Sequence, residues 1–64
     1  MLDIIIPVYN EGENISPTLD EINSKIKTEN RIFIVYDFDE DNTLPVVKNY
    51  INEKKKDNNL LLKN

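Results

Sequence analysis

The feature that most constrains the fold is a run of three consecutive isoleucines, Ile4–Ile6, which ends at Pro7 and Val8. A continuous apolar run of this length predicts a strand that is buried on both faces, as in a parallel sheet. Beyond a polar loop, apolar side chains recur at steps of four, three and four, at Ile15, Leu19, Ile22 and Ile26. This spacing predicts an amphipathic helix that packs one face on the sheet.

The same order of elements is then repeated along the chain. The polar segment 28–30 ends the helix, and the nearly apolar segment Arg31–Tyr36 predicts a second strand. A strand, a helix and a strand in this order predict a right-handed parallel βαβ unit. An acidic loop follows, and Asn42 or Thr43 is typical of the cap of a second helix with Pro45 in its first turn.

The second helix has its apolar face at Val47, Tyr50 and Ile51, and we expect Tyr50 to pack in the core. After a polar turn, the segment Leu60–Leu62 predicts a third short strand. The predicted fold class is therefore α/β, a βαβα arrangement with a third strand at its end, as in a fragment of a Rossmann-like domain with a parallel sheet.

The length of 64 residues allows one small domain at most. A βαβα unit leaves strand edges and an apolar sheet face uncovered. We therefore expect residues 1–64 to be the incomplete N-terminal part of a larger domain. The exposed strand edges could also pair two copies of the chain as a homodimer.

Composition excludes several functional classes. The chain has no cysteine and no histidine, which excludes disulfides, thiolate metal sites and the usual general base near neutral pH. Its net charge of −4 gives no broad attraction to nucleic acid, so that we expect no nucleic-acid partner. The apolar start is too short to span a bilayer and lacks a basic leader. We expect a cytoplasmic location, with membrane association only through regions outside this segment.

The first loop carries side chains that suit a nucleoside. Tyr9 offers an aromatic face for a base, and Glu11 offers a carboxylate that accepts hydrogen bonds from ribose hydroxyls. Pro7 and Val8 bring the end of the strand, with its backbone groups, beside them. Such residues are also common in ordinary connecting loops, so that their chemistry alone leaves both interpretations open.

The second loop is crowded with carboxylates, at Asp37, Asp39, Glu40 and Asp41. This crowding indicates a cation, a hydrogen-bonding ligand or simple solvation. An EF-hand calcium loop that begins at Asp37 is excluded, because it needs Gly at its sixth position and Glu at its twelfth. Asn42 and Lys48 occupy those positions here.

The segment Tyr36–Asp39 also resembles the first motif of haloacid-dehalogenase-type phosphatases. That resemblance implies that Asp37 is a nucleophile and Asp39 a general acid–base, acting with magnesium. The phosphatase motif requires Gly-Thr directly after the second Asp, whereas three residues intervene here before Thr43. The phosphatase interpretation also leaves the first loop unexplained, and we keep it as an alternative.

The opening string closely resembles the start of the family-2 glycosyltransferases of GT-A fold, the group that includes the dolichol-phosphate mannose synthases. These proteins carry an apolar strand, then Pro-x-Tyr-Asn-Glu, and then Asn-Ile entering a helix. The chain matches them at Pro7, Tyr9, Asn10, Glu11, Asn14, Ile15, Leu19 and Ile22. The resemblance implies that Pro7, Tyr9 and Glu11 line the nucleotide part of a sugar donor, with backbone contacts from Val8.

The capping pattern and the family resemblance imply different starts for the first helix. Ser16 followed by Pro17 is typical of a cap and a first helical position, whereas the resemblance implies a start near Glu13 or Asn14. We therefore expect the helix to begin between Glu13 and Ser16.

The second family motif, Asp-Asp-Gly-Ser-x-Asp-x-Thr, is matched only in part. The resemblance implies that Asp37 contacts the base or ribose, and that Asp41 and Thr43 shape the loop and start the helix. Three positions depart from the motif, with Tyr36 in place of Asp, Phe38 in place of Gly and Asp39 in place of Ser. Because phenylalanine resists the positive φ that glycine tolerates, we expect the loop path and the choice of donor to differ.

The resemblance implies that the parent protein transfers a sugar from a UDP-sugar or GDP-sugar to an acceptor. In that family a divalent cation, Mg or Mn, takes part, and its ligands, the catalytic base and the acceptor site lie downstream of the matched region. We therefore expect residues 1–64 to hold no catalytic residue and no metal ligand, and to transfer no sugar alone. A non-catalytic, self-associating fragment is the alternative from a different functional class.

Overall fold

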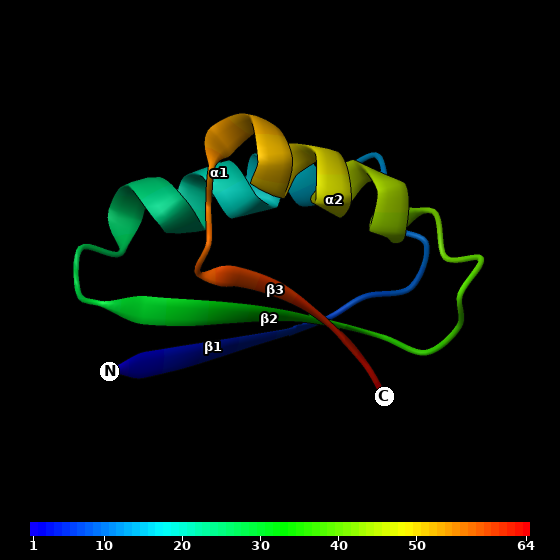
Figure 1. Ribbon diagram of the computed structural model, residues 1–64, viewed down its shortest axis with the longest axis horizontal. Coiled ribbons are helices and arrows are strands. Elements are labelled where there is room, and N and C mark those ends of the chain that lie inside the picture. The colour runs from blue at the N-terminus through cyan, green and yellow to red at the C-terminus, as the bar shows by residue number, and fades with distance from the viewer.

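The computed structural model describes all residues, 1–64, as three strands and two helices in strict alternation (Figure 1). The elements are β1 (Leu2–Pro7), α1 (Ile15–Lys25), β2 (Asn30–Tyr36), α2 (Thr43–Lys54) and β3 (Asn59–Lys63). The predicted α/β class is confirmed, and the third strand is present. Each strand extends one or two residues beyond its apolar run, because backbone pairing continues past the last apolar side chain.

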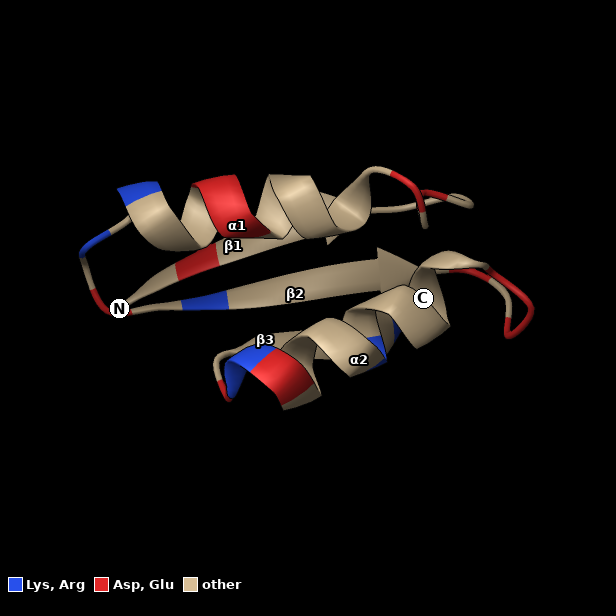
Figure 2. Cartoon of the chain, turned by 90° about the horizontal axis from the view of Figure 1, so that it is seen from above, with Lys and Arg blue, Asp and Glu red and all other residues tan.

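The three strands form one parallel sheet in the order β1-β2-β3. Ile5 is paired with Phe33, and Phe33 in turn with Leu60, so that the carboxyl ends of all strands lie at the same edge. Both helices cover the same face of this sheet (Figures 1 and 2). Because the strands are added in one direction and the helices share a face, the two crossovers have the same hand.

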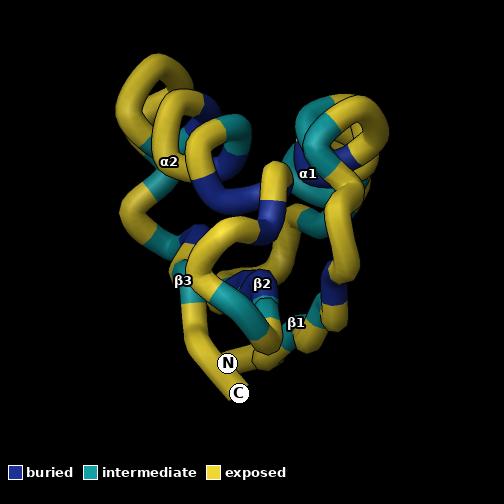
Figure 3. Tube along the Cα trace, turned by 90° about the vertical axis from the view of Figure 1, so that its right-hand side faces the viewer, coloured by how far each residue is buried: buried dark blue, intermediate teal, exposed yellow.

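The hydrophobic core lies between the sheet and the helices (Figure 3). Ile32 and Ile34 of the central strand are fully buried, as are Leu19 of α1 and Val47 of α2. The predicted helix faces therefore point at the sheet. Partly buried side chains surround this cluster, at Ile4, Ile6, Ile22, Tyr36, Val46, Ile51 and Leu61.

The other face of the sheet is uncovered, which contradicts our expectation that the isoleucine strand is buried on both faces. Ile5 is 60% exposed and Leu62 is 50% exposed. An ion pair on this face joins Arg31 to Asp3 at 2.9 Å, and the guanidinium lies 5.4 Å from the ring centre of Phe33. An apolar run predicts a parallel strand, but it does not show whether a layer covers each face.

Pro7 limits the free edge of β1. The amides of Leu2 and Val8 donate to carbonyls on the β2 side, so that by alternation the amides of Asp3 and Ile5 face outward. Residue 7 is also an outward position, and proline has no amide hydrogen to offer there. Only the first half of this edge can therefore donate to an added strand.

Both helices begin where the sequence predicts, but the predicted residues do not cap them. α1 begins at Ile15, inside the predicted interval, and Ser16 is not its cap. α2 begins at Thr43 after Asn42, as predicted, but the Asn42 side chain caps no helical amide. Instead the carboxylate of Asp41 accepts a hydrogen bond from the Thr43 amide at 2.7 Å.

Tyr50 lies in the core, as predicted, and joins the two helices. Its hydroxyl donates to Asp20 at 2.8 Å and accepts from the Asn23 amide group at 3.2 Å. Burial raises the pKa of Tyr50, and the hydrogen bond to the Asp20 carboxylate raises it further.

Candidate functional site

Two loops meet beyond the carboxyl ends of β1 and β2. Loop 1 comprises residues 8–14 and loop 2 comprises residues 37–42, and both lie at the right of Figure 1. In Figure 2 both loops contain stretches coloured red for Asp or Glu. In parallel α/β sheets, ligands bind at this edge, and the loops contain all the residues predicted for the site apart from Pro7, which ends β1.

The two loops are joined by three hydrogen bonds from consecutive backbone amides of loop 1. The Asn10 amide donates to the Asp41 carboxylate at 3.1 Å, and the Glu11 amide donates to the Thr43 hydroxyl at 2.8 Å. The Gly12 amide donates to the side-chain oxygen of Asn42 at 2.8 Å. We call this arrangement of residues 10–12 with residues 41–43 the interloop clasp.

Asn10 closes the clasp from the other direction. Its side-chain oxygen accepts a hydrogen bond from the Asn42 amide at 3.1 Å. The backbone of Asn10 has a φ of 50°, a left-handed conformation that asparagine tolerates better than most residues. Asparagine therefore supplies both the turn of loop 1 and one of its bonds to loop 2.

Gly12 allows the close approach of the loops without needing a positive φ. A Cβ atom at this position would lie 2.8 Å from the Asn42 carbonyl oxygen and 2.9 Å from its side-chain oxygen. Real Cβ atoms do not come so close to oxygen. The single glycine of the chain is therefore required by contact between the loops.

Asp41 is the buried centre of the clasp, with only 1% of its surface exposed. Burial raises the pKa of its carboxyl group, but hydrogen bonds from Thr43 and from the Asn10 amide outweigh this effect and lower the pKa overall. The second carboxylate oxygen, Oδ2, has no hydrogen-bond partner. The carboxylate is therefore charged at neutral pH and depends on the clasp amides for its stabilisation.

The interloop clasp determines which groups of loop 1 are available to a ligand. Its amides at residues 10–12 are bound by loop 2, and the amides of Asn14 and Ile15 donate to the Glu11 carbonyl. A phosphate cradle needs such amides to be free and directed at the ligand. Most of the loop 1 amides are therefore unavailable to a phosphate, and the loop presents side chains instead.

A hollow of about 150 Å³ lies beside loop 1, lined by Ile6, Pro7, Val8, Glu11, Asn14, Ile15 and Thr18. Three of the predicted site residues, Pro7, Val8 and Glu11, therefore share one concave surface. At about 30 Å³ for each water molecule, the hollow has room for about five waters, which is the scale of one sugar ring. The Tyr9 ring stands outside it and is 69% exposed.

Asp37 lies on the neighbouring loop but is directed elsewhere. Its carboxylate accepts a hydrogen bond from the side chain of Asn64 at 2.8 Å. Asp39 forms an ion pair with Lys63 at 3.0 Å, which raises the pKa of that lysine. The structure therefore brings Asp37 to the same edge of the sheet without joining it to the hollow.

Phe38 stands where the family motif has glycine. Positive φ occurs only at Asn10 and Lys55, so that loop 2 passes position 38 without the conformation that phenylalanine resists. The ring of Phe38 packs on Tyr9, with 5.6 Å between ring centres and 55° between the planes. No sequence pattern predicted that these two residues are in contact.

No group of three Asp, Glu, His or Cys side chains in the chain lies close enough to hold a metal ion. The carboxylates of loop 2 are separated by their partners on β3 and in the clasp. The divalent cation that the family resemblance implies stays a prediction.

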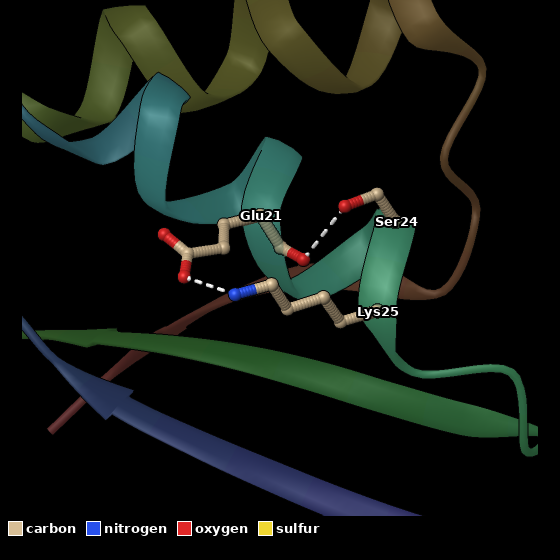
Figure 4. A network of polar contacts seen from close by, with 3 residues as sticks. All are labelled: Glu21, Ser24 and Lys25. Atoms are coloured by element: carbon tan, nitrogen blue, oxygen red, sulfur yellow. Dashed lines mark hydrogen bonds and ion pairs between the residues drawn. The ribbon is translucent and has the colours of Figure 1, made fainter.

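A second and larger hollow, of about 360 Å³, lies along α1 and away from the strand ends. It is lined by Thr18, Glu21, Ile22, Lys25 and Ile26. Figure 4 shows two of these residues, Glu21 and Lys25, with Ser24. Lys25 donates to the Glu21 carboxylate at 2.8 Å, and Ser24 donates to the Glu21 carbonyl at 3.0 Å. These contacts are local to one helix and add no group to the candidate site.

Comparison with protein families decides the relationship. The model of glycosyl transferase family 2 matches residues 3–63, which is nearly the whole chain. The chain belongs to glycosyl transferase family 2. Searches of curated proteins and of solved structures gave no match.

Membership of glycosyl transferase family 2 confirms the resemblance carried by the two loops and the parallel sheet between them. By family the chain is related to glycosyltransferases. The narrower likeness to the dolichol-phosphate mannose synthases stays a prediction. No helix of the chain is both long and apolar enough to cross a membrane.

Proposed function

We propose that residues 1–64 form the incomplete N-terminal part of a glycosyltransferase domain that binds the nucleoside of a UDP-sugar or GDP-sugar. The observation that carries this proposal is the interloop clasp, which uses the loop 1 amides and leaves its side chains for a ligand. The nucleotide-binding residues that we propose are Pro7, Val8, Tyr9, Glu11 and Asp37.

The exposed groups are complementary to a nucleoside. The Glu11 carboxylate borders the sugar-sized hollow and accepts hydrogen bonds, which suits ribose hydroxyls. The exposed Tyr9 ring suits stacking with a base. Asp37 is an acceptor for base N–H groups once the Asn64 amide group is displaced. These carboxylates accept hydrogen bonds and repel phosphate. The diphosphate must therefore be bound by other parts of the domain.

Titration of the amide NMR spectrum tests this assignment. Uridine and guanosine should shift loop 1 amides with a Kd of about 1 mM, which corresponds to about −4 kcal/mol. Inorganic pyrophosphate at the same concentration should shift none of them. Replacing Glu11 with Ala should weaken binding about tenfold, because a hydrogen bond to a charged group is worth about 1.5–3 kcal/mol.

Glu13→Ala is the matched control, because Glu13 is an exposed carboxylate of the same loop that does not line the hollow. This variant should bind nucleosides like the original chain. Loop 1 shifts produced by pyrophosphate but by neither nucleoside would refute the proposal. Equal losses in the two Glu variants would show that only the total charge of the loop matters.

The remaining family properties are proposals for the parent protein. We expect no sugar transfer by the 64-residue chain, since the divalent cation, its ligands and the base are assigned to downstream regions. A radiolabelled donor assay with the isolated chain checks this expectation, and measurable transfer would contradict it. The cytoplasmic location stays a prediction, as does self-association through the free edges of β1 and β3. Pro7 limits the β1 edge to its first half.

A further inference from the structure

Successive side chains of loop 2 point in opposite directions across the edge of the sheet. Asp37 and Asp39 are held by Asn64 and Lys63, which lie at the end of β3. Phe38, between them, packs on Tyr9 of loop 1, which follows β1. The alternation separates an acidic side of loop 2 from an aromatic side that faces the candidate site.

The backbone around Phe38 is fixed by the same clasp that shapes loop 1. The Phe38 carbonyl accepts a hydrogen bond from the Asp41 amide at 3.3 Å, which closes a turn. Asp41 in turn binds the Asn10 amide, one residue from Tyr9. The backbone beside each ring is therefore held by hydrogen bonds to Asp41.

The two rings form a corner. Their centres are 5.6 Å apart and their planes are inclined by 55°, within the range of favourable aromatic contacts. Phe38 is only partly exposed, whereas Tyr9 is 69% exposed. The contact with Phe38 therefore restricts the Tyr9 ring while leaving most of its surface open to a further planar group.

We propose that Phe38 is a specificity-determining residue of the nucleotide site, which supplies a second ring to the surface that receives the base. The inference rests on the proposed function and adds to it a residue at which the chain departs from the glycine of the family motif. A planar base covers Tyr9 and meets Phe38 with its edge. A ligand without a base gains nothing from this corner.

The test compares Phe38→Leu, which keeps an apolar side chain but removes the ring, with Phe38→Tyr, which keeps the ring. Kd values for UDP, GDP and ribose 5-phosphate are measured by NMR titration. Because an edge contact between aromatic groups is worth a factor of about 2 to 12, Phe38→Leu should weaken both nucleotides by about fivefold. Phe38→Tyr should stay within about twofold of the original chain, and binding of ribose 5-phosphate should not change.

Phe33→Leu is the matched control, because it removes the other phenylalanine of the chain from the uncovered sheet face. It should leave all three affinities unchanged. Spectra of the free variants show whether they fold and whether the Tyr9 ring signals move when the Phe38 ring is lost.

The outcomes separate the two proposals. If the original chain and Phe38→Leu bind nucleotides equally, the inference is overturned and the proposed function stands. Tighter binding by Phe38→Leu would also overturn it, because Phe38 would then occupy the place of the base. If the folded original chain binds no nucleotide, both proposals fail together.

Discussion

Asp41→Asn is the change that tests most directly how the candidate site is held together. Asparagine keeps the shape of the side chain and one acceptor oxygen for the Asn10 and Thr43 amides. It removes the charge, and it places a buried NH₂ group where Oδ2 has no partner. We expect this variant to have a lower free energy of unfolding and a weaker affinity at the proposed nucleotide site.

The magnitude follows from the contacts. A hydrogen bond to a charged group is worth about 1.5–3 kcal/mol and a neutral one about 0.5–1.5 kcal/mol, so that two weakened bonds cost about 2 kcal/mol. A buried donor without an acceptor adds about 1–3 kcal/mol. Relief of the cost of burying the charge offsets part of this sum. We expect a net loss of about 2–3 kcal/mol, against a total stability of roughly 3–10 kcal/mol for a chain of this length.

Urea unfolding followed by circular dichroism at pH 7 and about pH 2 checks the prediction. The folded pKa of Asp41 lies below its ordinary value of 3.8, so the folded state binds fewer protons and gains stability as the pH rises. The contribution is complete above about pH 5 and is lost as the pH falls through the folded pKa. The difference between the original chain and Asp41→Asn should therefore shrink in acid.

Asp39→Asn provides the comparison, since Asp39 is an exposed carboxylate whose ion pair with Lys63 is also exposed. Such pairs contribute at most about 1 kcal/mol. The reasoning about a buried clasp would be refuted if the two variants lost equal stability at pH 7. It would also be refuted if the Asp41 difference persisted unchanged at the lowest pH.

Two further substitutions address the loop contact and the core. Gly12→Ala should cost about 1–3 kcal/mol in thermal unfolding, since its Cβ would overlap the Asn42 carbonyl oxygen. Adding Asn42→Ala should not restore stability, because that carbonyl remains; full recovery would contradict the explanation. Tyr50→Phe should cost about 1 kcal/mol, since it removes the hydrogen bond to Asp20. Because the folded pKa of Tyr50 is raised above 10.0, this stabilisation is complete below about pH 10 and is lost as the pH rises through the folded value. A difference between Tyr50→Phe and the original chain that stays constant from pH 8 to 11 would argue against it.

The elements of the fold were predictable because each has its own pattern of apolar residues. Ile4–Ile6 and Arg31–Tyr36 mark strands, and the spacing of Ile15, Leu19 and Ile22 marks α1. The prediction that the isoleucine strand is buried on both faces was wrong. A strand sequence records that its side chains are apolar, whereas their burial depends on layers that other residues must supply.

The location of the predicted site residues at one edge of the sheet was predictable, but the contacts between the two loops were not. Pro7, Val8 and Glu11 line one hollow, but no sequence pattern predicted that Asp41 binds the Asn10 amide. Because nearly every residue has a backbone amide, the sequence does not indicate which amides form hydrogen bonds between loops. The Phe38 contact with Tyr9 was missed for a different reason, because the replaced glycine suggested strain rather than a new partner.

The interloop clasp has a consequence for protein engineering. Loop 1 takes its shape from side chains 30 to 32 positions later in the chain. A graft of residues 8–14 onto another α/β scaffold would therefore carry the side chains that we propose to bind a nucleoside, without the geometry that presents them. The transferable unit is the pair of loops, with β1 and β2 to keep them side by side, and mutational libraries in one loop must allow matching changes in the other.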